Sequence, residues 1–380
     1  MKVINPGNTI GMLGGGQLGR MSTFEAKQMG YRVVTLDPTL NSPCGQVADE
    51  QITASYTDPA GLRELAKKCD VVTYEFENVP AESVDLLVSL NTPVFPAGRV
   101  LRVTQNRLQE KMFARQAGLG VADFSGVSTR ADLDVAAQQV GFPAVLKTVS
   151  GGYDGKGQFI LQNMMDAVRA FEEVGGTALI WERLVPFEKE LSVICARNHA
   201  GEVAAYPATE NIHVNNILDV SIAPARVSPE VQQEAQHIAG VIAAALDLVG
   251  VCGIELFLLP DDTLLVNEIA PRPHNSGHYT IEACSCSQFE QHIRAVCGLP
   301  LGSPRLISSA VMVNFLGTGT GNALTGVSKV LHDPRVHFHL YGKAEAKANR
   351  KMGHLTVLAD DVEVALEKAL AAREKLSWID

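Results

Sequence analysis

Residues 251–272 read VCGIELFLLPDDTLLVNEIAPR, and this stretch decides the fold of the site. It predicts two apolar strands joined by a turn at PDDT. If Leu259 pairs with Leu264, Glu255 stands directly opposite Glu268, with the two Cβ atoms about 5 Å apart. We expect Phe257 to share the strand face of Glu255.

Two carboxylates at that separation repel each other unless a positive charge neutralises them. A Mg²⁺ ion that bridges phosphates would supply the charge, and carboxylate oxygens are ligands that magnesium prefers. The alternative is an acid–base dyad in which one carboxyl has a raised pKa. On the same register, Val266 and Leu264 share the strand face of Glu268.

A glycine-rich loop precedes this hairpin, in LKTVSGGYDGKGQ at 146–158. Lys147 ends an apolar strand expected at Ala144–Thr148, and four glycines follow within residues 151–157. Such a loop can close over a polyphosphate and exclude water. The loop lacks G-K-[ST], so it is no Walker A sequence.

A second glycine turn, GGGQLG at 14–19, follows a strand expected at Thr9–Leu13. Its G-x-G-x-x-G spacing, with Asp37 about 20 residues on, is typical of a dinucleotide site. The exposed N–H groups of such a turn favour any phosphate. An NAD-dependent oxidoreductase therefore stays open as an alternative.

Two further segments are rich in polar side chains. APRPHNSGH at 270–278 directly follows the second carboxylate and suits an anionic or sugar-bearing substrate. The strand end WERLV at 181–185 can offer backbone groups to an adenine ring, and Glu190 can accept from ribose hydroxyls. The alternative is that Glu182 and Glu190 are acidic residues on the solvated surface.

The charge balance excludes several classes of partner. The chain has 32 Lys and Arg against 42 Asp and Glu, for a net charge of −10, with no basic run. We therefore expect no nucleic-acid partner. No apolar run approaches the ~18 residues that span a bilayer. The beginning, MKVINPGNTIG, has no signal-peptide pattern, so we expect a cytoplasmic protein with reduced cysteines.

Together these segments resemble the ATP-grasp superfamily and, within it, the bicarbonate-using carboxylases of de novo purine synthesis. The resemblance covers nearly the whole chain in order. It rests on GGGQLGRM (14–21), YEFENVP (74–80), QNRLQEK (105–111), LKTVSGGYDGKGQ (146–158), the 182–190 segment, PATENIHVNNILDVSIAPA (207–225) and NEIAPRPHNSGHYTIEA (267–283).

The resemblance implies a mixed α/β and α+β architecture. It comprises a Rossmann-like parallel-sheet domain at 1–108, a central lid domain at 109–186 and a larger C-terminal domain at 187–380 that carries the metal site. Strands at Tyr31–Leu36 and Cys69–Tyr74 fit the parallel sheet. A polar helix around Val103–Gly118 is expected to leave the first domain.

The implied reaction is ATP- and bicarbonate-dependent carboxylation of 5-aminoimidazole ribonucleotide through carboxyphosphate, by a ligase that uses ATP and Mg²⁺, or Mn²⁺ in its place. A homodimer is implied as well. The near alternative is a formate-dependent ligase acting on glycinamide ribonucleotide. A non-catalytic ATP-binding regulator is a further alternative.

The resemblance also assigns roles to residues. The implied ATP contacts are Arg107, Lys147, Gly152, Tyr153, Asp154, Gly155, Lys156, Gly157, Gln158, Glu182, Arg183, Leu184, Val185, Glu190, His213, Asn267 and Glu268. The implied metal ligands are Glu255 and Glu268. The implied ribonucleotide and carboxyphosphate contacts are Gly16, Gln17, Leu18, Glu75, Tyr153, Asp154, Arg272, His274, Asn275, Ser276, Lys343 and Arg350. The implied catalytic residues are Glu75, Lys147, Tyr153, Lys156 and Arg272, with bicarbonate near Glu75, Tyr153 and Lys156.

Two positions depart from the pattern of the superfamily. Ala270 stands where many members have a metal-binding Asn, so metal coordination rests on two carboxylates with phosphates and water. Lys156 stands where some members have Arg. A lysine supplies charge without a bidentate fork, so its bicarbonate contact is expected to be single-pronged.

Overall fold

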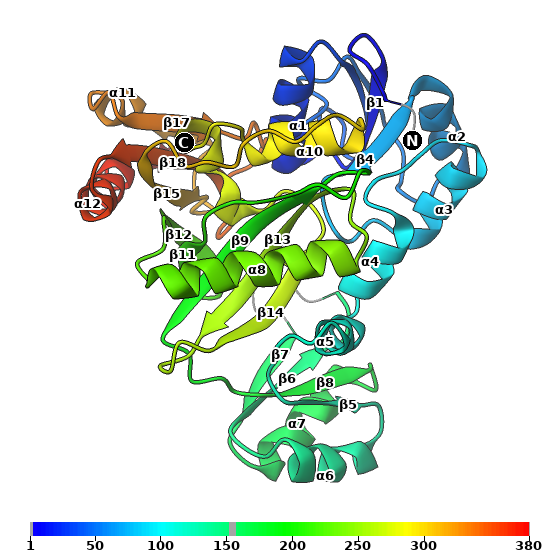
Figure 1. Ribbon diagram of the computed structural model, residues 1–380, viewed down its shortest axis with the longest axis vertical. Helices are drawn as coiled ribbons and strands as arrows, with labels where there is room; N and C mark the ends of the chain where they lie inside the picture. Colours follow the sequence, from blue (N-terminus) through cyan, green and yellow to red (C-terminus); the bar gives the residue numbers. More distant parts are fainter. Residues whose placement is uncertain (1–2, 152–156, 380) are drawn as a thin grey trace.

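The computed structural model describes residues 3–151 and 157–379, which form three units around one large sheet (Figure 1). The N-terminal unit, blue and cyan in Figure 1, is a parallel sheet in the order β3-β2-β1-β4. Its strands are buried along almost their whole length, as expected where helices cover both faces. The elements are β1 (Thr9–Leu13), α1 (Gln17–Gln28), β2 (Arg32–Leu36), β3 (Glu50–Ile52), α2 (Pro59–Lys68), β4 (Val71–Tyr74), α3 (Ala81–Ser89) and α4 (Gly98–Thr104).

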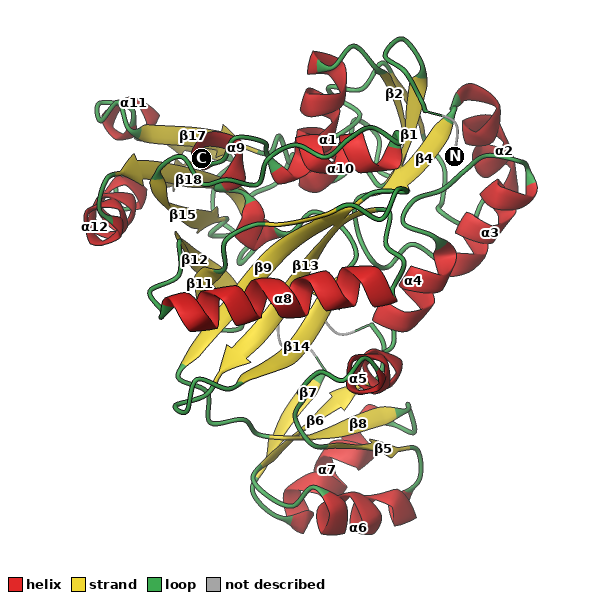
Figure 2. Cartoon of the chain, in the orientation of Figure 1, coloured by secondary structure: helices red, strands yellow, loops and turns green. Residues whose placement is uncertain are grey.

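The central unit is a small antiparallel sheet in the order β5-β8-β6-β7, with two helices on its outer face (Figure 2). Ala144 and Leu146 on β6 point into the core under these helices. Because side chains alternate along a strand, Lys147 lies on the opposite face, which is turned toward the large sheet. The elements are β5 (Phe124–Val127), α6 (Arg130–Gln139), β6 (Ala144–Thr148), β7 (Gln158–Leu161), α7 (Met164–Val174) and β8 (Leu179–Arg183).

The large sheet runs in the order β14-β13-β9-β11-β12-β15-β18-β17, and β10 also pairs with β9. One face packs under the long helix α8 (Pro229–Ala245), which begins with the capping residue Ser228 and a proline in its first turn. The strands are β9 (Lys189–Arg197), β10 (Val203–Ala205), β11 (Thr209–Val214), β12 (Ile217–Ala223), β13 (Gly250–Leu258), β14 (Leu264–Ala270), β15 (Ser309–Leu316), β17 (Val336–Leu340) and β18 (Lys351–Ala359).

Shorter elements complete the chain. The C-terminal helix α12 packs on β15 and β18, and two short strands, β16 and β19, pair with each other. These elements are α5 (Arg107–Gln116), η1 (Asn275–Gly277), α9 (Thr280–Ala283), α10 (Gln288–Val296), β16 (Ala323–Thr325), α11 (Val327–Val330), α12 (Val362–Arg373) and β19 (Ser377–Ile379).

The β13–β14 hairpin confirms that Glu255 pairs with Glu268, but by a different register from the one predicted. Leu258, not Leu259, pairs with Leu264, so the turn is longer than expected. The register then shifts after Glu255, and the resulting irregularity near Asn267 restores the opposition of the two carboxylates.

Because of this bulge, the residues that share a face of β14 differ from the predicted ones. Leu264 and Val266 are buried in the core beneath α8, whereas Glu268 is exposed, so they do not share its face. The prediction failed because a single extra residue reverses every side chain on one side of a bulge. Phe257 does lie on the Glu255 face and stacks on Phe187.

The helix predicted around Val103–Gly118 is two helices, α4 and α5, that meet at Gln105 and Asn106. The Asn106 side chain accepts a hydrogen bond from the Gln109 N–H and begins α5. This break places Arg107 in the first turn of a new helix rather than in the middle of a long one.

The N-terminal unit docks onto the large sheet through α10, which lies beside α1 in Figure 1. The Val251 N–H on β13 donates to Nδ1 of the buried His292 on α10. His292 Nε2 therefore carries a hydrogen and donates to the Thr73 hydroxyl on β4, at 2.7 Å. This contact holds the carboxyl end of β4 next to the end of β14, where the polar segments meet.

Two further findings concern the cysteines and the helices. The seven cysteines are free thiols in the structure. Among residues 3–151 and 157–379, no helix has both the length and the apolar character needed to cross a bilayer.

Candidate active site

The paired carboxylates of the hairpin form one wall of the site. Burial and the neighbouring Glu268 raise the pKa of Glu255 to about 7. The Asn267 side chain donates to Glu255 Oε2 at 3.5 Å, and Nε2 of His274 lies 3.5 Å from Glu255 Oε1. Glu255 is therefore a partly buried carboxylate held between two polar groups, whereas Glu268 is exposed.

Glu268 lines a cavity that also receives residues from the first and central units. Arg107 at the start of α5, Glu77 after β4 and Gly151 at the beginning of the glycine-rich loop share its wall. The Arg107 N–H donates to Val149 O, and its guanidinium donates to Thr148 O at 3.0 Å. The predicted phosphate and metal groups therefore meet in one place.

The edge strand β14 is covered by α5, which satisfies its main-chain groups with charged side chains. Lys111 Nζ donates to Asn267 O at 2.9 Å and Val266 O at 3.2 Å, next to the bulge. Glu110 accepts from the Ile269 N–H at 2.7 Å, while burial and nearby Glu268 hold the pKa of Glu110 well above its usual value. An exposed strand edge is thereby closed.

Lys111 also joins the metal hairpin to the central sheet. Its Nζ lies 3.6 Å from Glu182 Oε2, and the same oxygen accepts from Lys147 Nζ at 3.1 Å. Burial alone would raise the pKa of Glu182, but the two lysines outweigh it and hold this pKa below its usual value. Glu182 therefore orients Lys147 across the gap between the two sheets.

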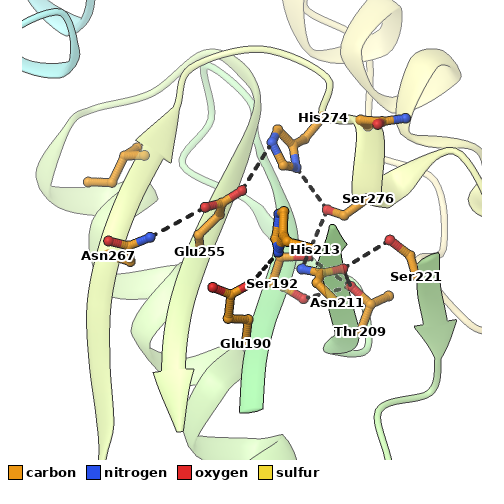
Figure 3. A network of polar contacts seen from close by, with 12 residues as sticks. Glu190, Ser192, Thr209, Asn211, His213, Ser221, Glu255, Asn267, His274 and Ser276 are labelled. Atoms are coloured by element: carbon orange, nitrogen blue, oxygen red, sulfur yellow. Dashed lines mark hydrogen bonds and ion pairs between the residues drawn. The ribbon is translucent and has the colours of Figure 1, made fainter. Parts of the chain in front are cut away.

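Glu190 on β9 and His213 on β11 form a second ion pair in the large sheet (Figure 3). Burial alone would lower the pKa of His213, but the adjacent Glu190 outweighs this effect and raises it. Gln158 at the start of β7 donates to Asn216 Oδ1 at 3.3 Å, just beyond β11. The strand that follows the glycine-rich loop thus reaches the same side of the large sheet.

The segment after β14 is organised by two pairs of side chains. Arg272 pairs with Glu77, and this ion pair outweighs burial so that the pKa of Arg272 is raised and that of Glu77 lowered. The amides of Asn275 and Asn314 exchange two hydrogen bonds, at 2.7 and 3.1 Å. Both polar atoms of the Asn275 side chain thus bond within the protein.

The first glycine turn binds carboxylates of the protein itself. The Gly16 and Gly19 N–H groups donate to Glu75, and the Gly15 N–H donates to Asp37 at 2.7 Å. A Cβ on Gly16 would lie 2.4 Å from Glu75 Oε1, so the turn needs glycine to admit that carboxylate. Its donors are occupied, which argues against a dinucleotide phosphate there.

The loop that carries Lys343 meets the same turn. Gln46 Nε2 donates to Gly342 O at 2.8 Å, and Leu18 packs with Tyr341. Lys343 acts electrostatically on Glu75, whose pKa burial nonetheless raises. The structure therefore brings Lys343 to the start of α1, where Gly16, Gln17 and Leu18 lie.

The contacts of the remaining predicted residues vary. Arg183 turns away and pairs with Asp123 at 3.0 Å, and Arg350 is exposed and donates to Glu345 O at 3.1 Å. Leu184 and Val185 follow β8 directly, while Gly157 comes just before β7. The remaining loop residues lie outside the described residues: Gly152, Tyr153, Asp154, Gly155 and Lys156.

Three families account for most of the chain. Residues 7–105 match the ribonucleotide synthetase preATP-grasp domain, residues 112–289 the ATP-grasp domain, and residues 310–368 the phosphoribosylaminoimidazole carboxylase C-terminal domain. The N5-carboxyaminoimidazole ribonucleotide synthase of Bacillus subtilis (strain 168) is 49% identical over 364 residues, which cover 94% of this chain and 93% of that protein.

The chain belongs to the N5-carboxyaminoimidazole ribonucleotide synthase family. The Brucella melitensis member is 44% identical over 93% of this chain and 97% of its own length. The ADP complex of one synthetase of this family superposes with a TM-score of 0.91 at 48% identity, covering 98% of both chains. A synthase from Aspergillus clavatus in complex with ADP and 5-aminoimidazole ribonucleotide gives 0.89 at 36% identity, covering 97% and 98%.

Membership of this synthase family confirms the predicted fold class and the prediction of an ATP-grasp ligase. The NAD-dependent oxidoreductase is wrong: Asp37 accepts from Gly15, from Thr39 and from the Tyr56 hydroxyl, so it is committed to the fold. The spacing alone could not reveal this, because a G-x-G-x-x-G turn also forms around a protein carboxylate.

The residues present fit a hard divalent cation. Among the described residues, no three His, Cys, Asp or Glu side chains gather around one position, so the protein offers two opposed carboxylates there. Burial first and the neighbouring Glu268 second raise the pKa of Glu255, so its ionised form is disfavoured without a cation. An oxygen-only donor pair with this charge suits Mg²⁺ held jointly with phosphates.

The Glu255 pKa predicts how the stability of the metal-free protein depends on pH. The unfolded carboxyl ionises near pH ~4.3, so the folded protein holds an extra proton between that value and about 7. The contribution of Glu255 to the free energy of unfolding is fully present below pH ~4.3. It is lost as the pH rises from there to about 7, at up to about 1.4 kcal/mol per pH unit.

Thermal unfolding in EDTA between pH 5 and pH 8 measures this dependence. We expect Glu255→Gln to have a flatter pH dependence of Tm than the wild-type protein, and the difference isolates this carboxyl from all others. Parallel Tm curves for the two proteins would contradict the assignment.

Three residues of the site were not predicted as functional: Glu77, Glu110 and Lys111. Their segments were recognised, but spacing could not show which side chain reaches which partner. The decisive feature of Glu110 and Lys111 is their burial, which forces them to find charged or main-chain partners and which only the structure reveals.

Proposed function

We propose that the chain catalyses the carboxylation of 5-aminoimidazole ribonucleotide with ATP and bicarbonate. Bicarbonate attacks the γ-phosphorus of ATP, which gives ADP and carboxyphosphate. The exocyclic amine of the ribonucleotide then attacks the carboxyl carbon, phosphate leaves, and N5-carboxyaminoimidazole ribonucleotide is formed. The proposal also places the chain in de novo purine synthesis.

The single observation that carries the proposal is the cavity shared by Arg107, Glu268, Glu77 and Gly151. It brings a phosphate-binding cation, a metal-binding carboxylate and the beginning of the glycine-rich loop together. Glu77 also pairs with Arg272, which supports placing the ribonucleotide next to the nucleotide. Transfer between two small substrates requires this adjacency.

On this proposal, the protein acts mainly through charge and position, as phosphoryl transfer requires. Lys147 and Arg107 neutralise the ATP phosphates, and Glu182 fixes the direction of Lys147. Glu190 and His213 bind the ribose. Glu255 and Glu268 would hold Mg²⁺, which neutralises charge on the transferred phosphoryl group when bound.

The ribonucleotide end rests on residues from two units. Lys343 and Arg350 receive its phosphate, and Gly16, Gln17, Leu18 and Glu75 face its ribose and base. Arg272, His274 and Ser276 lie beside carboxyphosphate. The glycine-rich loop, predicted as a lid over Gly152–Gln158, would exclude water, because carboxyphosphate is lost to hydrolysis.

We further propose the domain boundaries 1–108, 109–186 and 187–380, a homodimer and a cytoplasmic location. The gap between two matched families at 105–112 supports the first boundary. Limited proteolysis and light scattering are the measurements for the boundaries and the oligomeric state.

The function is tested by ADP release with each combination of substrates. We expect rapid release only when 5-aminoimidazole ribonucleotide and bicarbonate are both present with Mg·ATP, together with formation of the carbamate product. Rapid turnover with formate and glycinamide ribonucleotide would instead identify the formate-dependent alternative. Binding of Mg·ATP without any turnover would favour the regulator.

A further inference from the structure

A chain of polar side chains runs through the large sheet and ends at Glu255 (Figure 3). All but the last two of its members are more than nine-tenths buried. Its contacts are Ser221 Oγ to Asn211 Oδ1 at 2.9 Å, Asn211 Nδ2 to Ser192 Oγ at 2.8 Å, Ser192 Oγ to Ser276 Oγ at 2.7 Å, Ser276 Oγ to His274 Nδ1 at 2.8 Å, and His274 Nε2 to Glu255 Oε1 at 3.5 Å.

The Glu255 carboxylate determines in which direction the hydrogen bonds of this network donate. As a metal ligand Glu255 is ionised, and an ionised carboxylate only accepts hydrogen bonds. Nε2 of His274, which faces it, must therefore carry a hydrogen. In a neutral imidazole Nδ1 is then the acceptor, so the Ser276 hydroxyl donates to it.

With hydrogen bonds donated in this direction, the side chains of Ser276, Ser192 and Asn211 also find their partners. The Ser276 oxygen accepts from the Ser192 hydroxyl, and the Ser192 oxygen accepts from Asn211 Nδ2 and from the nearby Thr209 hydroxyl. Ser192 thus uses its one donor and both its acceptor positions. Asn211 Oδ1 accepts from Ser221, so each donor of the chain points toward Glu255.

The opposite direction is unfavourable. If His274 carried its hydrogen on Nδ1, the lone pair of Nε2 would face the carboxylate oxygen. A ring with both hydrogens would leave the buried Ser276 hydroxyl without its acceptor on Nδ1. Burial and the neighbouring Arg272 hold the pKa of His274 well below its usual value, which agrees with a neutral ring.

We propose that Ser276, Ser192 and Asn211 are positioning residues that hold His274 in its Nε2–H form and thereby orient the Glu255 carboxylate toward a divalent cation. The inference rests on the proposed magnesium site. His274 approaches Oε1 and Asn267 approaches Oε2, so each carboxylate oxygen faces one donor. Each oxygen keeps one lone pair for the cation, and the rotation of the carboxylate is fixed.

The tautomer of His274 can be measured directly by ¹⁵N NMR of the ring nitrogens in histidine-labelled protein with Mg²⁺ and ADP. The His274 signals are assigned by their loss in His274→Asn. We expect a single Nε2–H form in the wild-type protein. In Ser276→Ala and Ser192→Ala the Glu255 carboxylate still faces Nε2, but the hydroxyl that donates to Nδ1 is removed or released, so we expect a hydrogen on Nδ1 to appear.

The Mg²⁺ concentration for half-maximal turnover is the second measurement. We expect it to rise about 10–100-fold in both serine variants, the usual effect of losing a residue that orients a metal ligand. Thr209→Val is the matched control, because it removes a buried hydroxyl that donates to Ser192 from the side, while Asn211 still donates to Ser192 and Ser192 still donates to Ser276. It should leave the tautomer and the Mg²⁺ requirement unchanged.

Two results overturn the inference: a wild-type His274 with its hydrogen on Nδ1, or serine variants that keep the pure Nε2–H form and the wild-type Mg²⁺ requirement. Two separate serine variants are used so that the loss of folding in one leaves the other to decide. A wild-type protein that binds no Mg·ADP would instead overturn the proposed metal site, which keeps the two failures distinct.

Discussion

Glu268→Gln is expected to lower turnover by on the order of 10³-fold while the protein stays folded. The amide keeps the shape of the side chain but supplies no negative charge for the cation. Because the change removes the repulsion that contributes to the raised pKa of Glu255, the metal-free variant should unfold at the wild-type temperature or above it. Wild-type turnover in this variant would remove the metal site.

The measurement is steady-state ADP release together with the shift of Tm produced by Mg·ADP. A ligand that binds only the folded state raises Tm, so loss of the shift reports loss of metal-nucleotide binding. Asp261→Asn is the matched control, because it removes an exposed carboxylate from the turn of the same hairpin. The amide oxygen can still accept from the Thr263 N–H, so both turnover and the Tm shift should be preserved.

The opposition of Glu255 and Glu268 could be predicted from the sequence, but by two errors that cancel. The turn is one residue longer than expected, and the irregularity near Asn267 corrects the register before the carboxylates are reached. Alternation of apolar residues specifies a strand, whereas a bulge depends on what covers the strand edge. Here Lys111 from a distant helix binds the Asn267 carbonyl, which no local pattern reveals.

The positions of the glycine-rich turns were readable, but the occupant of the first one was not. G-x-G-x-x-G requires only that a negative group meet the N–H groups of a turn and a helix N-terminus. In this chain that group is Glu75, which lies 59 residues from Gly16 in sequence. Contacts between such distant residues depend on strand order, and spacing within one segment carries no information about it.

The residue roles transferred by resemblance were most informative where a motif carries one charged residue. Lys147 and Arg272 each stand alone on their strand or segment, and the structure gives each a carboxylate partner. Resemblance was less informative where a motif carries several charges. In the WERLV segment Glu182 turns inward, whereas Arg183 turns outward to Asp123.

Lys147→Met is expected to lower kcat/KM for ATP by about 10²–10³-fold, the usual effect of losing one preorganised charge at a transferring group. It also removes the 3.1 Å hydrogen bond from Lys147 and leaves buried Glu182 with Lys111 at 3.6 Å and the charge of Arg107. A buried group that loses its hydrogen-bond partner costs about 1–3 kcal/mol, so Tm should fall as well. Activity and stability are therefore affected together.

The double variant Lys147→Met with Glu182→Gln separates the two effects. It removes the buried charge, so we expect much of the lost stability to return while turnover stays low. Lys68→Met is the matched control, since Lys68 pairs with Glu50 and Glu64 on the exposed surface of the first unit and should change neither property appreciably. If turnover returned along with stability in the double variant, Lys147 would act only by neutralising Glu182, and its contact with ATP would be excluded.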